Sequence, residues 1–260
     1  MRALPAHAPI RSPSKSLLEQ LLLAAVRKLV AEPPALTVER TRDAAHGDYA
    51  SNIAMRIAKG LGKSPREVAQ DIIALLPASP FVSRVEVAGN GFINFFLAPD
   101  ALAREIRRIH ELGDAYGRSS VGAGKLHLPR TDENPLYSAQ YAHARVASAM
   151  KEVKARGISF DLARALEHLE LLDKDTERLL IAALLRFPDE VESATANCAP
   201  HSIVYYLREV ANAFHDYYNA ETWFVAEDDL RSARLALVLA AGQVVRNGLG
   251  LIGVSAPESM

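Results

Sequence analysis

The sequence has 260 residues and a mass of 28.3 kDa, enough for one large domain or two modest ones. With 49% hydrophobic and 23% charged residues, it has sufficient apolar surface to fold, which excludes a predominantly disordered chain. No apolar run approaches the ~18 residues of a membrane span, and the single cysteine, Cys198, excludes an intrachain disulfide and a four-thiolate zinc site. We therefore expect a cytoplasmic protein without a signal peptide or a membrane segment.

The formal net charge of −1 conceals an asymmetry between the two halves of the chain. Residues 1–130 contain 18 Lys and Arg against 12 Asp and Glu, whereas residues 131–260 contain 12 against 19. The halves thus carry +6 and −7, which predicts two modules with different surfaces. The basic half is suited to a polyanion, although chance variation between two soluble domains would produce the same difference.

Helices and a small sheet are predicted for residues 16–112, after a proline-containing flexible tail at residues 1–15. Apolar residues at helical spacing, bounded by proline or glycine, predict the helices. Their ranges are 17–30, 49–61, 65–76 and 101–112, and a short β-type stretch at 36–40 follows the first. The clearest helix start is at Ser64, because Pro65 and Glu67 complete a capping box.

A β-hairpin is predicted between the third and fourth of these helices. Residues 82–87 and 92–97 contain alternating apolar and polar runs, and a Gly-Asn-Gly turn at residues 89–91 separates them. Asp100 is expected to cap the helix that follows. The N-terminal half is therefore an α+β domain with a small antiparallel sheet.

Residues 113–133 are rich in glycine and are interpreted as a linker. From residue 134 onward no strand pattern persists, and the chain to residue 260 is predicted to be an all-α helical bundle. The predicted helices are 137–156, 161–171, 176–186, 188–196, 200–221 and 229–249. The fold class is thus a two-domain chain, α+β followed by all-α.

No catalytic residue, metal site or cofactor site is predicted. The eight histidines form no metal-binding signature, and no Ser/His/Asp arrangement can be identified. The glycine-rich residues 117–126 do not follow the phosphate-loop pattern, since Leu126 stands where a magnesium-binding hydroxyl is required.

Aromatic residues are concentrated between positions 205 and 224 of the sequence. They are Tyr205, Tyr206, Phe214, Tyr217, Tyr218, Trp223 and Phe224. The spacing of Tyr206, Phe214 and Tyr217 is typical of a helix core. Trp223 follows the predicted helix end, where an indole could stack on an unpaired base.

Several blocks of the chain together resemble the non-catalytic parts of the arginyl-tRNA synthetase family. They lie at residues 46–55 (HGDYASNIAM), 88–95 (AGNGFINF), 134–145 (NPLYSAQYAHAR), 186–191, 199–203, 206–209, 214–219 and 246–260. The first two resemble the N-terminal additional domain of the family, which contacts the D-loop of tRNA, and the others resemble its DALR anticodon-binding domain. The family's class I catalytic domain, with its HIGH and KMSKS-like motifs, has no counterpart here. The resemblance thus implies no ATP or arginine site, and leaves open whether the chain is an enzyme.

The resemblance assigns D-loop binding to Phe92, Asn94 and Asn52. Phe92 would stack and Asn94 would hydrogen-bond a base edge, while the alternative for Phe92 is a place in the hairpin core. Asp48, in the same block, is interpreted as a helix cap.

Anticodon binding is assigned by the same resemblance to Tyr141, His143, Arg145, Trp223, Arg246 and Asn247. Arg145 would pair with a phosphate and Trp223 would stack on a base of the anticodon loop. Asn247 and Gly248 could equally form only a local bend.

The resemblance implies a tRNA-binding protein derived from arginyl-tRNA synthetase, with arginine tRNA as its partner and an accessory or regulatory role. One alternative is a protein-interaction module that binds a partner through the acidic bundle. Another is the non-catalytic part of a split or internally deleted arginine–tRNA ligase.

Overall fold

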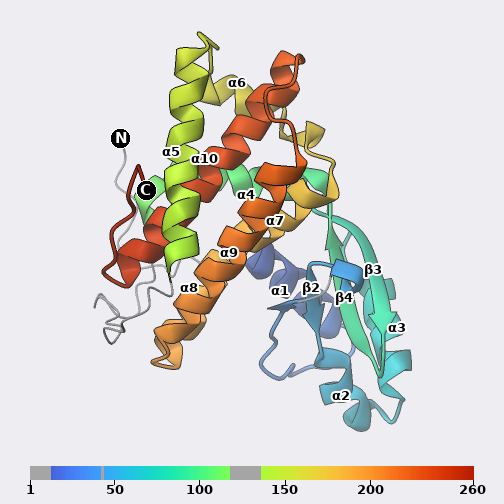
Figure 1. Ribbon diagram of the computed structural model, residues 1–260. Coiled ribbons are helices and arrows are strands. Elements are labelled where there is room, and N and C mark those ends of the chain that lie inside the picture. Colours follow the sequence, from blue (N-terminus) through green and yellow to red (C-terminus); the bar gives the residue numbers. More distant parts are fainter. Residues whose placement is uncertain (1–12, 42–43, 118–135) are drawn as a thin grey trace, which may run out of the picture. The chain divides into compact units, whose positions relative to one another are not determined.

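The computed structural model describes residues 13–41, 44–117 and 136–260 (Figure 1). The chain divides into two compact units, whose described parts are residues 13–102 and 103–260. We call them the N-terminal unit and the helical unit. Most of the predicted linker lies outside the described residues.

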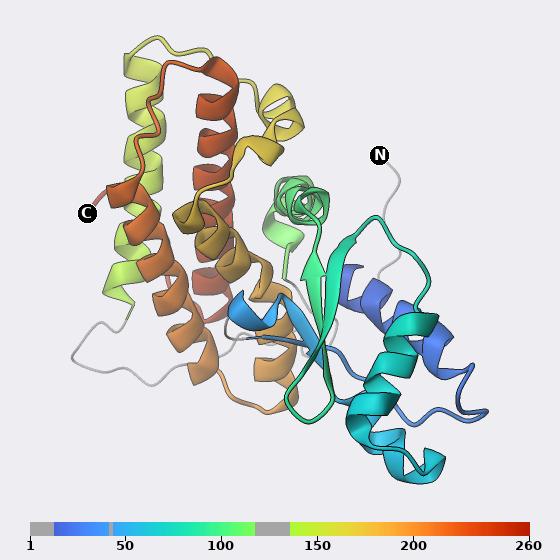
Figure 2. The same ribbon diagram turned by 90° about the vertical axis from the view of Figure 1, so that its right-hand side faces the viewer.

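The N-terminal unit contains a four-stranded antiparallel sheet with strand order β1-β2-β4-β3. Its elements are α1 (Pro13–Val26), β1 (Glu39–Arg40), a 3₁₀ turn at Ala44–His46, β2 (Tyr49–Ser51), α2 (Ile53–Leu61), α3 (Pro65–Leu75), β3 (Val82–Ala88) and β4 (Phe92–Leu97). Figure 2 shows the three helices on one side of the sheet. Buried side chains of β4, such as Ile93 and Phe95, join those of the helices in one core. The predicted hairpin and the small sheet are confirmed.

The prediction of a helix over residues 49–61 is wrong in its first turn. Tyr49 and Ser51 are buried and pair with Phe95 and Ile93 of β4, so this segment is strand β2. The helix begins only at Ile53. The apolar spacing that predicts the helix comes from residues after Asn52, and pairing with β4 decides the conformation of the three residues before it.

The turn that leads into β2 explains why Asp48 is not a helix cap. Gly47 has φ +79°, and a Cβ atom there would lie 2.6 Å from the Phe95 carbonyl oxygen. The Asp48 amide donates to that same oxygen at 2.8 Å, and the Asp48 carboxylate accepts from the Leu97 amide at 2.7 Å. Burial raises the pKa of Asp48, against the opposing effect of the Leu97 hydrogen bond. Asp48 therefore fastens β4 rather than the start of α2.

The predicted capping box of α3 is present. The Ser64 hydroxyl accepts from the Glu67 amide at 3.3 Å, and the Glu67 carboxylate accepts from the Ser64 amide at 2.8 Å. Hydrogen bonding to Ser64, through its side chain and its backbone amide, lowers the pKa of Glu67. The box fixes the turn between α2 and α3.

The helical unit is all-α in its described residues, as predicted. Its elements are α4 (Pro99–Leu112, shared at its first turn with the N-terminal unit), a 3₁₀ turn at Gly113–Ala115, α5 (Tyr137–Ala155), α6 (Leu162–Glu167), a 3₁₀ turn at Leu169–Leu171, α7 (Asp175–Leu185), α8 (Phe187–Ala196), α9 (His201–Ala220) and α10 (Asp228–Leu251). Asp100 lies inside the first turn of α4, so it does not have the capping position expected for it. None of the described helices is both long and apolar enough to cross a bilayer.

Helix α4 joins the helical unit through its C-terminal half. Arg107 donates from Nε to the Leu166 carbonyl at 2.8 Å, and His110 donates from Nε2 to the Ala236 carbonyl at 2.9 Å. Residues 103–112 thus belong to the helical unit in the structure, whereas the sequence pattern assigns them to the N-terminal domain.

Helices α5, α9 and α10 pack on one another and form the frame of the bundle (Figure 1). Two glycines allow α10 to approach its neighbours closely: a Cβ atom at Gly242 would lie 2.8 Å from Val146, and one at Gly248 would lie 2.6 Å from Leu207. Asn247 and Gly248 lie inside α10, which continues to Leu251.

Candidate nucleic-acid interface

Aromatic rings and one guanidinium form a continuous row along α5, α9 and the loop after α9. We call this set the aromatic row: Tyr137, Tyr141, Arg145, His215, Tyr218, Trp223 and Phe224. Tyr137 and Tyr141 are one helical turn apart on α5, with ring centroids separated by 6.1 Å and planes within 10°. The other neighbouring rings are 5.5 Å (Tyr141–His215), 4.9 Å (Tyr218–Trp223) and 4.7 Å (Trp223–Phe224) apart.

Arg145 connects the α5 and α9 parts of the row. Its guanidinium carbon lies 4.0 Å from the ring centroid of Tyr218 and 5.5 Å from that of Tyr141. Nη2 donates to the Asn219 side-chain oxygen and Nη1 to His215 Nδ1, both at 3.2 Å. No carboxylate within the described ranges forms an ion pair with Arg145. Its orientation is thus fixed by neutral partners, and its charge remains available for an anion.

His215 is the hydrogen-bond partner of Arg145 whose protonation can change near neutral pH. Burial lowers the pKa of His215 and the neighbouring Arg145 charge lowers it further, against a backbone hydrogen bond to Ser138 and the charge of Asp216. The neutral ring can accept from Arg145 at Nδ1, whereas a protonated ring cannot. Arg145 therefore keeps this hydrogen bond only while His215 is neutral.

We expect the free energy of unfolding to fall as the pH drops through 6.5, the ordinary pKa of the histidine. Above that pH, His215 is neutral in both the folded and the unfolded state; below it, the unfolded state binds the proton first, so acid favours unfolding. Urea unfolding above and below about pH 6.5 measures the change. In His215→Gln, which keeps an acceptor and does not titrate, the free energy of unfolding should depend less on pH than in the wild type. His110, whose pKa is also lowered, contributes equally to the pH dependence of both proteins. Equal pH dependence in the two proteins would contradict this assignment.

His143 and Arg246, two of the residues assigned to the anticodon, lie together on a different side of α5 from Tyr141. His143 is 3% exposed; it donates from Nδ1 to the Pro257 carbonyl at 2.8 Å, and its Nε2 accepts from Arg246 at 3.4 Å. His143 therefore holds the C-terminal segment, while Arg246 remains exposed.

Asn247 is also separate from the aromatic row. Its side-chain amide donates to the carbonyls of Gly113 at 2.8 Å and Tyr116 at 3.0 Å. These bonds attach the turn after α4 to α10, so the amide does not serve as a base-reading group in this structure.

Trp223 belongs to the row but its ring is covered. It is 7% exposed and lies between Tyr218 and Phe224. A base needs an accessible ring face to stack on, so the stacking role assigned to Trp223 does not fit its burial. Tyr137 and Tyr141, with 56% and 38% exposure, present the accessible ring surface.

In the N-terminal unit, the structure separates the three residues assigned to the D-loop by their exposure. Phe92 begins β4 and is 43% exposed, which excludes a place in the hairpin core. Asn52 is exposed at the start of α2, and the pairing of Ser51 with Ile93 brings it beside Phe92. Asn94 is 4% exposed, between Ala50 and Glu86 of the adjacent strands. A buried amide cannot reach a base edge, so the contact assigned to Asn94 is not supported.

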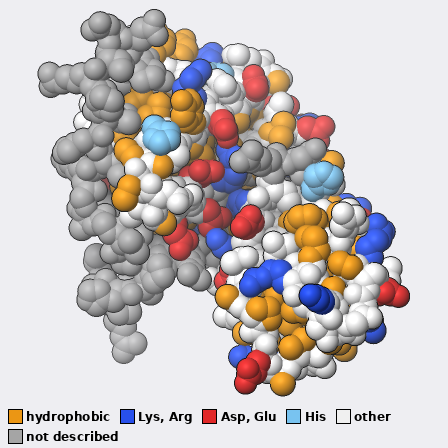
Figure 3. Space-filling view, turned by 90° about the horizontal axis from the view of Figure 1, so that it is seen from below, with side chains coloured by type: hydrophobic (Ala, Val, Ile, Leu, Met, Phe, Trp, Pro, Cys, Tyr) orange, Lys and Arg blue, Asp and Glu red, His pale blue; other side chains and the backbone are white. Residues whose placement is uncertain are grey.

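Positive side chains from α3 and β3 lie against the hairpin that carries Phe92. Arg66 donates to the Gly89 carbonyl at 2.8 Å in the turn that precedes Phe92. Arg84 is stacked 3.8 Å from the ring centroid of Phe96 and also pairs with Glu86. Figure 3 shows Lys and Arg side chains interspersed with hydrophobic ones on the N-terminal unit, on the right of the view. This mixture is suited to stacking combined with phosphate contacts.

Four members of the row, Tyr137, His215, Tyr218 and Phe224, are missing from the residues assigned by resemblance. The spacing of Tyr137 and Tyr141, four residues apart, is a signal that could have identified the first. Tyr218 adjoins Tyr217, which is fully buried, and only the helical phase of α9 distinguishes them. In the described part of the chain, no group of three or more His, Cys, Asp or Glu residues is arranged to hold a metal ion.

Two family descriptions match this chain. Residues 139–260 match the DALR anticodon binding domain, and residues 16–97 match the arginyl tRNA synthetase N terminal domain. Residues 139–260, the larger part of the helical unit, thus match an anticodon-binding domain of the DALR class. Residues 98–138, between the matches, are too few for a doubly wound nucleotide-binding domain.

The chain belongs to the arginyl-tRNA synthetase family. It is 37% identical to an arginine–tRNA ligase of Coxiella burnetii over 214 residues, which are 78% of this chain and 35% of that protein. It is 46% identical to an arginine–tRNA ligase of Legionella pneumophila over 135 residues, 52% of this chain and 23% of that one. The chain thus spans about a third of the length of the first of these relatives, and less of the second.

Solved structures of the same family share the fold. A Thermus thermophilus arginyl-tRNA synthetase structure has a TM-score of 0.69 at 14% identity, covering 95% of this chain and 100% of that chain. One from Plasmodium falciparum has a TM-score of 0.68 at 8% identity, covering 98% and 100%. At these identities, the likeness concerns the fold alone.

Proposed function

We propose that this chain binds tRNA without aminoacylating it, and that arginine tRNA is its ligand. The observation that carries the proposal is the aromatic row, in which Arg145 lies against Tyr141 and Tyr218 inside a domain of the anticodon-binding class. The names of the relatives support arginine tRNA in particular. We place the protein in the cytoplasm, where the thiol of its single cysteine, Cys198, would remain reduced.

The physical basis of the proposal is stacking combined with one fixed charge. Unpaired bases of an RNA loop stack on exposed aromatic faces, and Tyr137 and Tyr141 present two nearly parallel ones. Arg145 would take a phosphate while its planar group remains stacked on Tyr218. Arg246, exposed elsewhere on the unit, would add only a backbone contact.

Phe92 and Asn52 form a second proposed contact, with the D-loop. Phe92 has the exposed ring needed for stacking, and Asn52 has an exposed amide beside it. Two weak contacts on one chain strengthen each other when both can engage the same tRNA.

The aromatic row is tested by anisotropy with a fluorescent arginine tRNA and its isolated anticodon stem-loop, over a series of salt concentrations. Tyr141→Ala should weaken binding of both RNAs by about 5- to 100-fold, which corresponds to the loss of one stacked base. Arg145→Met should weaken binding and also flatten the salt dependence, because one phosphate contact is removed. Tyr205→Ala and Arg208→Met are matched controls, since both residues are exposed on α9 outside the row.

Phe92→Ala separates the second contact from the first. It should weaken binding of whole tRNA and leave the anticodon stem-loop unaffected. No binding of arginine tRNA by the wild type at low salt would refute the proposed function, since electrostatic contacts are strongest there. Recovery of a protein partner without RNA would favour the interaction module instead. Aminoacylation by the purified chain would overturn the non-catalytic assignment.

A further inference from the structure

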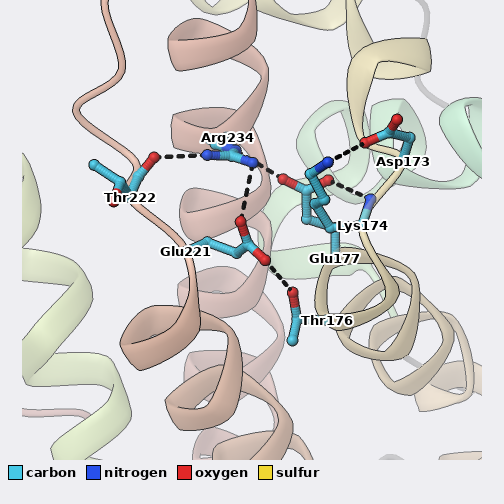
Figure 4. A network of polar contacts seen from close by, with 7 residues as sticks. All are labelled: Asp173, Lys174, Thr176, Glu177, Glu221, Thr222 and Arg234. Carbon is cyan, nitrogen blue, oxygen red and sulfur yellow. Dashed lines mark hydrogen bonds and ion pairs between the residues drawn. The ribbon is translucent and has the colours of Figure 1, made fainter.

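A buried ionic network joins α7, the end of α9 and α10 (Figure 4). The Arg234 side chain is 5% exposed and donates from Nε to the carboxylate of Glu177, which is fully buried, at 2.7 Å. Its Nη2 donates to Glu221 at 3.2 Å and its Nη1 to the Thr222 carbonyl at 2.6 Å. One guanidinium on α10 thus holds α7 and the first residues of the loop after α9.

The second oxygens of both carboxylates are also occupied. The Lys174 amide donates to Glu177 at 3.0 Å, and the Thr176 hydroxyl donates to Glu221 at 2.9 Å. A network whose members are all paired has one defined geometry, whereas a partly paired one does not. In Figure 4, the contacts of Glu177, Glu221 and Thr222 meet at Arg234.

A second arginine of α10 holds the other end of the same loop. Arg231 donates from Nη1 to the Val225 carbonyl at 2.7 Å and to the Ala226 carbonyl at 3.3 Å. Arg234 and Arg231 therefore hold the loop at residues 221–227 near its two ends, through hydrogen bonds to backbone carbonyl oxygens of the loop. Its aromatic side chains, Trp223 and Phe224, lie between these points.

We propose that Arg234 is a positioning residue for RNA binding, because it fixes the loop that supports the aromatic row. A short chain of contacts leads from Arg234 to the row. Arg234 bonds to the Thr222 carbonyl, and the next residue, Trp223, packs against Tyr218. The ring of Tyr218 in turn lies under the guanidinium of Arg145. Arg234 is too deeply buried to touch RNA itself. This inference rests on the proposed function, and it assigns to the network an effect on RNA affinity that is separate from its effect on stability.

The decisive variant removes the network while keeping the bundle folded. In Arg234→Met/Glu177→Met, a buried ion pair is replaced by apolar side chains of similar size, a change that proteins commonly tolerate. The Thr222 carbonyl and Glu221 lose their donor, so the loop is released at that end. The matched control is Arg186→Met/Glu209→Met, which removes an Arg–Glu pair between the end of α7 and α9 that does not touch the loop.

Three measurements are made on each full-length protein: the thermal unfolding midpoint, the fluorescence of Trp223 and the affinity for the anticodon stem-loop. Trp223 is the only tryptophan, so its emission reports the loop directly. We expect the network variant to remain folded, to show red-shifted emission with easier acrylamide quenching, and to bind the stem-loop about tenfold more weakly. The control should match the wild type in emission and affinity.

Unchanged Trp223 emission in the folded network variant would overturn the positioning role, whether or not RNA binds. Changed emission with unchanged affinity would show that the loop is held by Arg234 but does not support the row, and would also overturn it. If the wild type binds no RNA, the proposed function fails, and the claim that Arg234 acts on RNA affinity fails with it. The fluorescence measurement then still decides whether Arg234 holds the loop.

Discussion

Arg234→Met alone should lower the free energy of unfolding by about 3–5 kcal/mol, because it leaves the fully buried carboxylate of Glu177 without its counter-ion. Urea unfolding followed by circular dichroism measures this change. Adding Glu177→Met to the same protein should restore most of the loss, since the fully buried charge is then removed and the carboxylate that has lost its arginine partner, Glu221, is 18% exposed. The two substitutions should therefore be strongly non-additive.

The exposed pair formed by Arg164 and Asp229 provides the comparison for this result. Both side chains are largely in solvent, so Arg164→Met should change the free energy of unfolding by about 1 kcal/mol or less. Equal destabilisation by Arg234→Met and Arg164→Met would contradict the importance given to burial.

Gly47→Ala should strongly destabilise the N-terminal unit. The left-handed conformation at Gly47 costs an L-residue about 1–2 kcal/mol, and the new Cβ atom would lie 2.6 Å from the Phe95 carbonyl oxygen. That contact should add about 1–3 kcal/mol, because a strand backbone cannot move away freely. Thermal unfolding of the two proteins measures the combined loss.

Gly62→Ala is the matched control, because Gly62 also has a positive φ but a Cβ atom added there would meet no atom within 4 Å. It should show only the conformational cost. If the two alanine variants are equally stable, the close approach to β4 does not determine the effect at Gly47.

Local signals in the sequence predicted much of the fold. The capping box at Ser64 and the Gly-Asn-Gly turn of the hairpin act within a few residues, so their outcome does not depend on the rest of the chain. The helices of the bundle are also local, and the glycines and prolines at their ends limit their extent. The burial of Tyr206, Phe214 and Tyr217 was likewise indicated by helical spacing.

Features decided by distant partners could not be predicted in the same way. Residues 49–51 form a strand because β4, more than forty positions later, pairs with them. The carboxylate of Asp48 finds the Leu97 amide for the same reason. Spacing along the chain contains no information about such contacts until the fold is known.

The sequence predicted which segments form the candidate site, but not which side chains within those segments belong to it. His143 and Arg145 are two positions apart on α5, so they face different surroundings, and only Arg145 joins the aromatic row. Trp223 is in the row but is covered by its neighbours. A family resemblance identifies the segment, whereas the helical phase and the packing determine which side chains are accessible.

The attachment of α4 to the bundle determines where the molecule can be divided into working fragments. Ile106 and Ile109 are fully buried in the part of α4 that belongs to the helical unit, and His110 and Asn247 bond across the same seam. A fragment that ends at Leu112 would carry these isoleucines without their partners and expose an apolar stripe prone to self-association. A cut at the boundary of the units, after Leu102, leaves that stripe with the bundle. Fragment studies that assign each RNA contact to one unit should therefore separate the chain there.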